Sequence, residues 1–136
     1  MSEPGCVFCQ IVAGEAEAFV IGSGPGAVAF LDIAPLSRGH ALVVPTAHVP
    51  DLLHGGADVL HVVAPLVEEV SRLLVGRLGA DGLNLFQSSG EAAGQEVPHF
   101  HVHLVPRWRG DGVVRGFERD PMAAEDLDAL HARLLG

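Results

Sequence analysis

Residues 94–107 read GQEVPHFHVHLVPR, and the pattern within this stretch decides how the chain folds. Three histidines alternate strictly with three apolar residues: His99, Phe100, His101, Val102, His103 and Leu104. Successive side chains of a β-strand point to opposite faces. The alternation therefore predicts a strand with one apolar face toward the core and another face that carries three imidazoles. Pro106 has no N–H group for a ladder, so we expect it to limit the strand.

The histidine face requires a reason, because imidazoles that titrate near neutrality are costly to bury without partners. A catalytic site, a metal site and a solvated strand face all fit the pattern. A catalytic metal cluster is disfavoured, because such hydrolase sites usually add a nearby carboxylate ligand, whereas Leu104, Val105 and Pro106 follow the triad. Just upstream, Gly94-Gln95 can present backbone N–H groups as an anion-binding nest.

Composition limits the class of protein. The 136 residues are 49% hydrophobic and 18% charged, which suits one globular domain with its own core. No apolar run reaches the roughly 20 residues of a membrane helix, and the first five residues lack the features of a signal peptide, so we expect a cytoplasmic protein. A formal net charge of −9 argues against general binding to nucleic-acid backbones. All eight basic residues are arginine, so a phosphate site must use histidine, arginine or backbone N–H groups.

Apolar periodicity predicts the other elements. A short helix is expected at 6–12, and a long helix at 59–78, where apolar residues recur every three or four positions around Pro65. A weaker pattern predicts a terminal helix at 123–135. Four further strands are expected, at 19–21, 27–31, 39–45 and 83–87. Antiparallel strands with one long helix predict an α+β fold in a single domain 1–136, with its core at about 6–108 and a C-terminal extension at 109–136.

The triad stretch resembles the histidine-triad (HIT) motif, in which three histidines alternate with apolar residues and two apolar residues follow. Gly94-Gln95 before the triad and Pro106-Arg107 after it also match that family. The resemblance covers the chain from Cys6 to about Trp108. It implies the HIT fold and a homodimer in which two sheets join edge to edge.

Cys6 and Cys9 have C-x-x-C spacing, which by itself fits a redox pair, two buried small apolar residues or a metal site. A redox pair of the thioredoxin type belongs to a βαβ unit, and no such unit is predicted here. In many bacterial members of the HIT family, such a pair joins two histidines around a structural zinc ion. The resemblance implies the same set here, with one zinc per chain held by Cys6, Cys9, His48 and His99.

The resemblance also implies a purine nucleotide pocket. Five apolar residues match positions that sandwich the base: Val7, Phe8, Ile11, Phe30 and Ile33. Val7 and Ile11 fit a plain core equally well. Asp32 matches the acid that accepts hydrogen bonds from the ribose hydroxyls, although a turn aspartate has the same appearance.

The phosphate is expected against His101, His103 and the loop at 94–97. The residues implied for this part of the site are Ser88, Gly94, Gln95, Glu96 and Val97. Two of them depart from the family. Ser88 stands where asparagine is frequent, and Glu96 stands where eukaryotic phosphoramidases carry serine, so either its side chain turns away from the phosphate or the substrate preference differs. His40 matches a further family histidine near the triad.

These residues predict an enzyme that attacks the α-phosphorus of purine nucleoside phosphoramidates or related nucleotidyl conjugates. His101 is the predicted nucleophile, which forms a nucleotidyl-histidine intermediate, and His103 and His40 assist it. A dinucleoside polyphosphate hydrolase of the same fold is the first alternative. A nucleotide-binding protein without catalysis is the second, and it predicts tight binding with no turnover.

Overall fold

The structure is a computed structural model that describes residues 2–55, 57–113 and 126–136. Its centre is a five-stranded antiparallel sheet with the order β1-β2-β3-β5-β4. The strands are β1 (Val20–Gly24), β2 (Ala27–Leu31), β3 (Ala41–Pro45), β4 (Gly82–Phe86) and β5 (Val102–Arg107). The helices are α1 (Val7–Val12), α2 (Ala57–Leu78), α3 (Leu127–Leu135) and the short 3₁₀ turn η1 (Glu91–Ala93). The predicted α+β fold is confirmed, and no described helix has the length and apolar character to cross a membrane.

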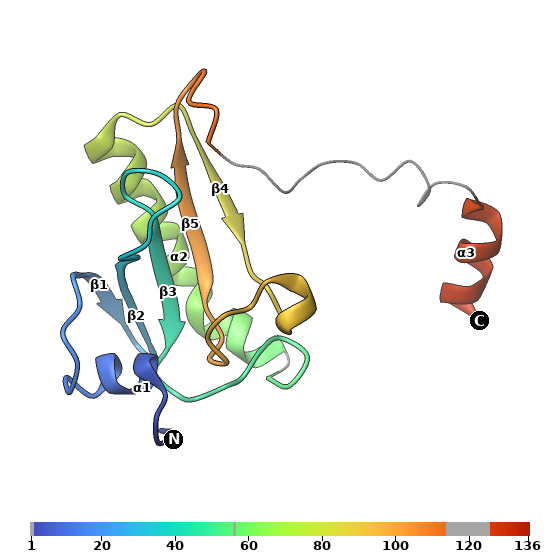
Figure 1. Ribbon diagram of the computed structural model, residues 1–136, viewed down its shortest axis with the longest axis horizontal. Coiled ribbons are helices and arrows are strands. Elements are labelled where there is room, and N and C mark those ends of the chain that lie inside the picture. Colours follow the sequence, from blue (N-terminus) through green and yellow to red (C-terminus); the bar gives the residue numbers. More distant parts are fainter. Residues whose placement is uncertain (1, 56, 114–125) are drawn as a thin grey trace.

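The two faces of the sheet have different covers. Helix α2 lies behind the sheet in Figure 1 and buries a stripe of apolar side chains against it: Val59, Val63, Leu66, Val70 and Leu74. Each such side chain stabilises the fold by roughly 1.5–3 kcal/mol on burial. Helix α1 covers part of the opposite face, where Phe8 packs with Phe30, Leu42 and Val44. Strand β3 lies between both covers, which explains why all five of its residues are buried.

The start of β5 differs from the prediction. The alternation of faces is confirmed, because Phe100, Val102 and Leu104 all enter the core under α2. However, the strand begins at Val102, so His99 and His101 precede it and only His103 lies within it. The Phe100 N–H donates to the Val49 carbonyl oxygen at 2.6 Å rather than to a neighbouring strand. This segment is therefore anchored to the connection that follows β3.

Pro106 does not limit β5, which continues to Arg107. On one side Pro106 pairs with Leu83 of β4. On the other side β3 pairs with β5 only from Val102 to Leu104, so no strand there needs the N–H group that proline lacks. In contrast, Pro45 ends β3 as predicted.

Other boundaries shift by a few residues. Helix α2 begins at Ala57 and runs through Pro65. His40 precedes β3, because its N–H donates to the Ser37 carbonyl oxygen in the preceding turn. The described part of the terminal helix is Leu127–Leu135, with the Asp126 side chain as its N-cap. The predicted start of that helix at 123–125 lies outside the described residues.

Candidate functional site

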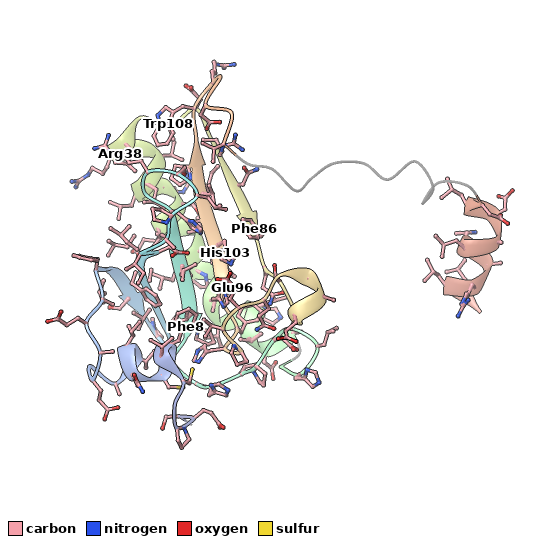
Figure 2. All side chains as sticks on the ribbon, in the orientation of Figure 1. Phe8, Arg38, Phe86, Glu96, His103 and Trp108 are labelled. Atoms are coloured by element: carbon pink, nitrogen blue, oxygen red, sulfur yellow. The ribbon has the colours of Figure 1, made fainter. Side chains whose placement is uncertain are left out.

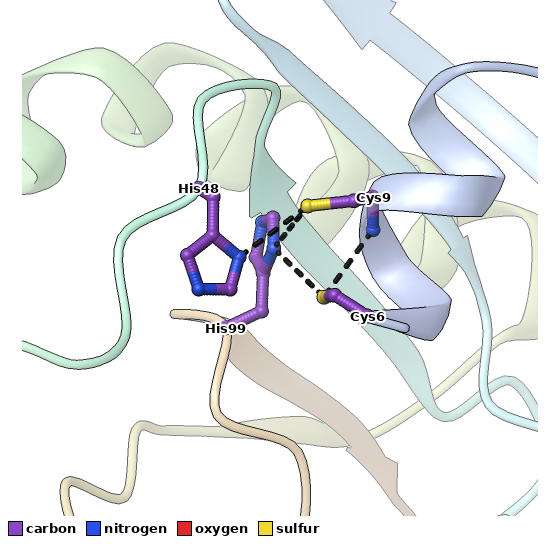
Figure 3. Close-up of side chains that lie close together, drawn as sticks. All are labelled: Cys6, Cys9, His48 and His99. Atoms are coloured by element: carbon purple, nitrogen blue, oxygen red, sulfur yellow. Dashed lines mark hydrogen bonds between the residues drawn. The ribbon is translucent and has the colours of Figure 1, made fainter. Parts of the chain in front are cut away.

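Cys6, Cys9, His48 and His99 come together from three parts of the chain, as predicted, and Figure 3 shows their side chains converging. Cys6 caps α1 and Cys9 lies within it, while His48 follows β3 and His99 precedes β5. The Cys6 and Cys9 Sγ atoms lie 3.5 and 3.6 Å from the His99 Nδ1 atom. The Cys9 Sγ atom lies 3.3 Å from the His48 Nδ1 atom.

These distances fit the edges of a metal tetrahedron. With zinc–sulfur bonds of about 2.3 Å and zinc–nitrogen bonds of about 2.05 Å, a tetrahedral angle places sulfur and nitrogen about 3.6 Å apart. The His99 Nε2 atom lies 2.9 Å from the Pro45 carbonyl oxygen. Because that contact needs an N–H donor, the proton lies on Nε2 and the Nδ1 lone pair faces the sulfur atoms. Burial lowers the pKa of His99, which favours this neutral form. The four residues could therefore hold a metal ion.

His101 is oriented by the same segment. Its Nδ1 atom lies 2.7 Å from the His99 carbonyl oxygen, so Nδ1–H donates there and the Nε2 lone pair is left for other chemistry. The side chain is buried, and burial lowers its pKa. Phe8 packs edge-on against both imidazoles, with ring centroids 5.8 Å from His99 and 5.1 Å from His101. One histidine thus contributes its ring to the metal cluster and its carbonyl group to the neighbouring imidazole.

A chain of hydrogen bonds fixes the protons of His40 and His103. The Leu36 N–H donates to the His40 Nδ1 atom at 2.9 Å, so the proton of neutral His40 lies on Nε2. That Nε2 atom lies 3.0 Å from the His103 Nδ1 atom and donates to it. The proton of neutral His103 must then lie on its own Nε2 atom. Burial lowers the pKa of His40 and, together with the neighbouring histidines His101 and His40, lowers that of His103 to about 4.

Asp32 completes this second cluster. Its Oδ2 atom lies 3.6 Å from the His40 Nε2 atom, and its Oδ1 atom accepts the Ala34 N–H at 2.8 Å. The ligand atoms of Asp32, His40 and His103 lie within 4.8 Å of one another. A metal ion would nevertheless have to displace the Nε2 proton that the Leu36 contact fixes on His40. The cluster is therefore better suited to hold and move protons than to bind a cation.

A cavity of about 310 Å³ opens beside these histidines. His101, His103 and Asp32 line it, together with every apolar residue predicted for the base: Val7, Phe8, Ile11, Phe30 and Ile33. Val7 is 43% exposed and Ile33 is 87% exposed, so neither belongs to the plain core. Apolar walls with a few convergent polar groups are typical of a small-molecule site.

The loop before the triad has a different arrangement from the predicted nest. The Gly94 and Gln95 N–H groups donate to the carbonyl oxygens of Glu91 and Gly90. The Gln95 side chain bonds to Gly90, Pro50 and Val97, which ties the loop to the segment after β3. Glu96 and Val97 line the cavity, whereas Gly94, Gln95 and Ser88 are not among its lining residues. A phosphate role for those three residues stays a prediction.

Phe86 was not predicted as a residue of the site. Its ring stacks on His103 with centroids 4.4 Å apart and planes inclined by 11°. The two residues are direct partners in the register of β4 and β5, so the contact depends on strand pairing. Glu17, Ala18 and Leu42 also line the cavity without having been predicted. The pattern of alternating residues locates a face, but it does not identify the neighbours across it.

Comparison with known proteins identifies the family of this chain. The model of the HIT domain matches residues 13–110, which is most of the chain. The chain belongs to the HIT family. An uncharacterized HIT-like protein of Methanocaldococcus jannaschii is 41% identical over 131 residues, which cover 96% of this chain and 99% of that protein. The adenosine 5′-monophosphoramidase of Schizosaccharomyces pombe is 33% identical, with 92% of each chain covered.

One similar solved structure is zinc-bound. The zinc-bound histidine triad family protein of Mycobacterium smegmatis is 38% identical and superposes with a TM-score of 0.77. The match covers 96% of this chain and 95% of the other. The family resemblance predicted from residues 94–107 is therefore confirmed, and the HIT family includes enzymes that act on nucleotides.

Proposed function

We propose that this HIT protein hydrolyses purine nucleoside phosphoramidates or related nucleotidyl conjugates, with His101 as the nucleophile. The observation that carries the proposal is the hydrogen bond from His101 Nδ1–H to the His99 carbonyl oxygen. It leaves an imidazole lone pair on Nε2 in a residue that lines the cavity, beside the Nε2–H group of His103. A relative 33% identical to this chain is an adenosine 5′-monophosphoramidase, which supports this reaction class.

In the first half-reaction, His101 Nε2 forms a bond to the α-phosphorus, and the bond from phosphorus to the leaving nitrogen breaks. The electron pair of that bond remains on the departing nitrogen, which needs a proton. His103 supplies it from Nε2 after an anionic phosphate has favoured its protonated form. When His103 takes up that second proton on Nδ1, the His40 Nε2–H group can turn to Asp32 Oδ2, which lies 3.6 Å away.

In the second half-reaction, water attacks the nucleotidyl-histidine from the side that the amine has left. A bond from phosphorus to the water oxygen forms, the bond from phosphorus to His101 Nε2 breaks, and the water proton passes to His103. The products are a nucleoside monophosphate and an amine, and His101 regains its neutral form. In this proposal the apolar walls of the cavity hold the base, and Asp32, which lines the same cavity, accepts hydrogen bonds from the ribose hydroxyl groups.

We further propose one structural zinc ion per chain at Cys6, Cys9, His48 and His99. Bound there, zinc supplies no reacting water, because four protein ligands close its coordination. The sulfur–nitrogen distances of 3.3–3.6 Å and the His99 tautomer support the assignment. The homodimer, the single domain 1–136 and the cytoplasmic location remain predictions of the sequence. Light scattering at micromolar concentration tests the dimer, which a monomer mass would contradict.

Turnover of a panel of substrates tests the function. The panel contains adenosine and guanosine phosphoramidates, diadenosine polyphosphates and the two nucleoside monophosphates as binding controls. We expect phosphoramidates to be hydrolysed and dinucleoside polyphosphates to be poor substrates, because the part of the cavity lining that the structure describes contains no arginine. Preferential hydrolysis of diadenosine polyphosphates would favour the alternative enzyme, and tight monophosphate binding without any turnover would favour a binding protein.

A further inference from the structure

Two carboxylates of the cavity, Glu17 and Glu96, have no part in the steps above, and Glu96 is the one that also borders a second hollow. Glu96 lies between η1 and β5 and lines the cavity together with His101 and His103. In the view of Figure 2, Glu96 is labelled between His103 above it and Phe8 below it. Among the residues that the structure describes, no arginine forms an ion pair with Glu96. A carboxylate in this place repels the phosphate of a nucleotide, so its presence requires an explanation.

Glu96 also marks the junction of two hollows. A second hollow of about 510 Å³ shares Val7, Glu96 and Val97 with the nucleotide cavity. Its lining adds Glu3, Pro4 and His48, and no described residue of either lining is an arginine. A group that departs from the α-phosphorus toward this second hollow therefore passes the Glu96 carboxylate, with no arginine among the described residues around it.

We propose that Glu96 selects nucleotidyl amidates whose leaving group carries a positive charge, such as an alkylamine with a terminal ammonium group. This rests on the proposed function and specifies its substrate class. The ammonium group lies between the α-phosphate and Glu96, where it offsets their mutual repulsion. The loop after η1 thus determines which leaving groups are preferred, while residues of α1 and β2 hold the nucleoside.

The test uses three adenosine 5′-phosphoramidates of matched chain length, whose amine ends in an ammonium group, a methyl group or a carboxylate. For the wild-type protein, kcat/KM should fall by about two- to fivefold at each step in that order, the range of one partly solvated charge pair. Glu96→Gln should reduce both ratios, and Glu96→Lys should reduce them further. Glu91→Gln, an exposed acid of η1 outside both linings, is the matched control and should keep the wild-type ratios.

Equal ratios in wild type and Glu96→Gln would overturn the proposal. A preference for the carboxylate substrate that depends on added Mg²⁺ would also overturn it, and would assign Glu96 to a divalent cation instead. If no amidate is turned over, the proposed function fails, and calorimetric dissociation constants of the three amidates decide the inference separately. If wild type binds the three amidates in the same order and the differences in affinity shrink in Glu96→Gln, the role of Glu96 is still supported. Equal affinities for the three amidates in wild type would contradict that role.

Discussion

Two histidine clusters lie side by side along the triad, and they differ in what their nitrogen atoms face. His99 turns Nδ1 toward two cysteine sulfur atoms, and its Nε2–H is fixed on the Pro45 carbonyl oxygen. His101, two residues later, fixes Nδ1–H on a carbonyl oxygen and lines an open cavity. Identical side chains thus suit the two different roles proposed for them, metal ligand and nucleophile, according to which ring nitrogen is bonded and what surrounds the other.

The clusters also differ in exposure to a ligand. In the proposed metal cluster the four side chains face one another, and Cys6, Cys9 and His99 are buried. In the second cluster, Asp32, His101 and His103 line a cavity, and His40 donates to His103 and lies 3.6 Å from an Asp32 oxygen atom. If this contrast is correct, changes in the catalytic cluster should affect kcat, whereas changes in the metal cluster should first affect stability.

The largest expected effect is on catalysis. His101→Ala should lower kcat by at least about 10³, the size of effect expected when covalent catalysis is lost. Nucleoside monophosphate binding should remain, because the apolar walls of the cavity are unchanged. Steady-state kinetics and calorimetry measure the two quantities. A variant that retains more than about a tenth of wild-type turnover would remove His101 from the nucleophile role.

Loss of a metal ligand should act mainly on stability. Cys9→Ser should leave less than about a third of an equivalent of zinc on protein purified without chelator, and should lower the unfolding free energy by several kcal/mol. Elemental analysis and denaturant unfolding measure these changes. Because Cys6 still caps α1 in the Cys9→Ser variant, the helix should keep its length, and the measured change reports the loss of one metal ligand. Full zinc content in this variant, or an unchanged stability after chelation of wild type, would contradict the metal assignment.

A smaller effect on kcat is expected when the proton chain is cut. His40→Ala removes the donor to His103 Nδ1 and leaves a buried acceptor unsatisfied, which costs roughly 1–3 kcal/mol, or about 5- to 150-fold in kcat. His40→Gln retains an N–H donor and should recover part of the loss. The zinc content should be unchanged in both variants. An equal kcat for wild type and His40→Ala would show that the His103 tautomer does not depend on His40.

The smallest expected effect is a dependence of stability on pH. The pKa of His103 is lowered to about 4 in the folded protein, below its ordinary value of 6.5. Between these values the unfolded chain binds more protons than the folded protein. The contribution of His103 to stability is therefore fully present above pH 6.5 and decreases as pH falls toward 4. In His103→Asn, the decrease in unfolding free energy between pH 7.0 and pH 4.5 should be smaller than in wild type by roughly 1–3 kcal/mol. Unfolding at pH 7.0 and pH 4.5 tests this, and identical pH dependence in both proteins would contradict it.

The sequence predicted the two faces of the triad because side-chain alternation is a local property of extended backbone. Through the resemblance of its motifs to the HIT family, it also predicted that Cys6, Cys9, His48 and His99 lie together and which apolar residues line the cavity. The start of β5 was predicted wrongly, because it depends on the hydrogen bond from the Phe100 N–H to the Val49 carbonyl oxygen, and these two residues are distant in the chain. The stacking of Phe86 on His103 was not predicted for a similar reason, since it follows from the register of β4 and β5.

The contrast between the two clusters is tested most directly by rapid-quench mass spectrometry during turnover of an adenosine phosphoramidate. The account predicts a transient mass increase of one nucleotidyl group on the peptide that contains His101, and none in His101→Ala. Tandem fragmentation should place the group on His101 rather than on His99 or His103. A nucleotidyl group on either neighbour, or full turnover in wild type with no covalent adduct at any quench time, would contradict the account.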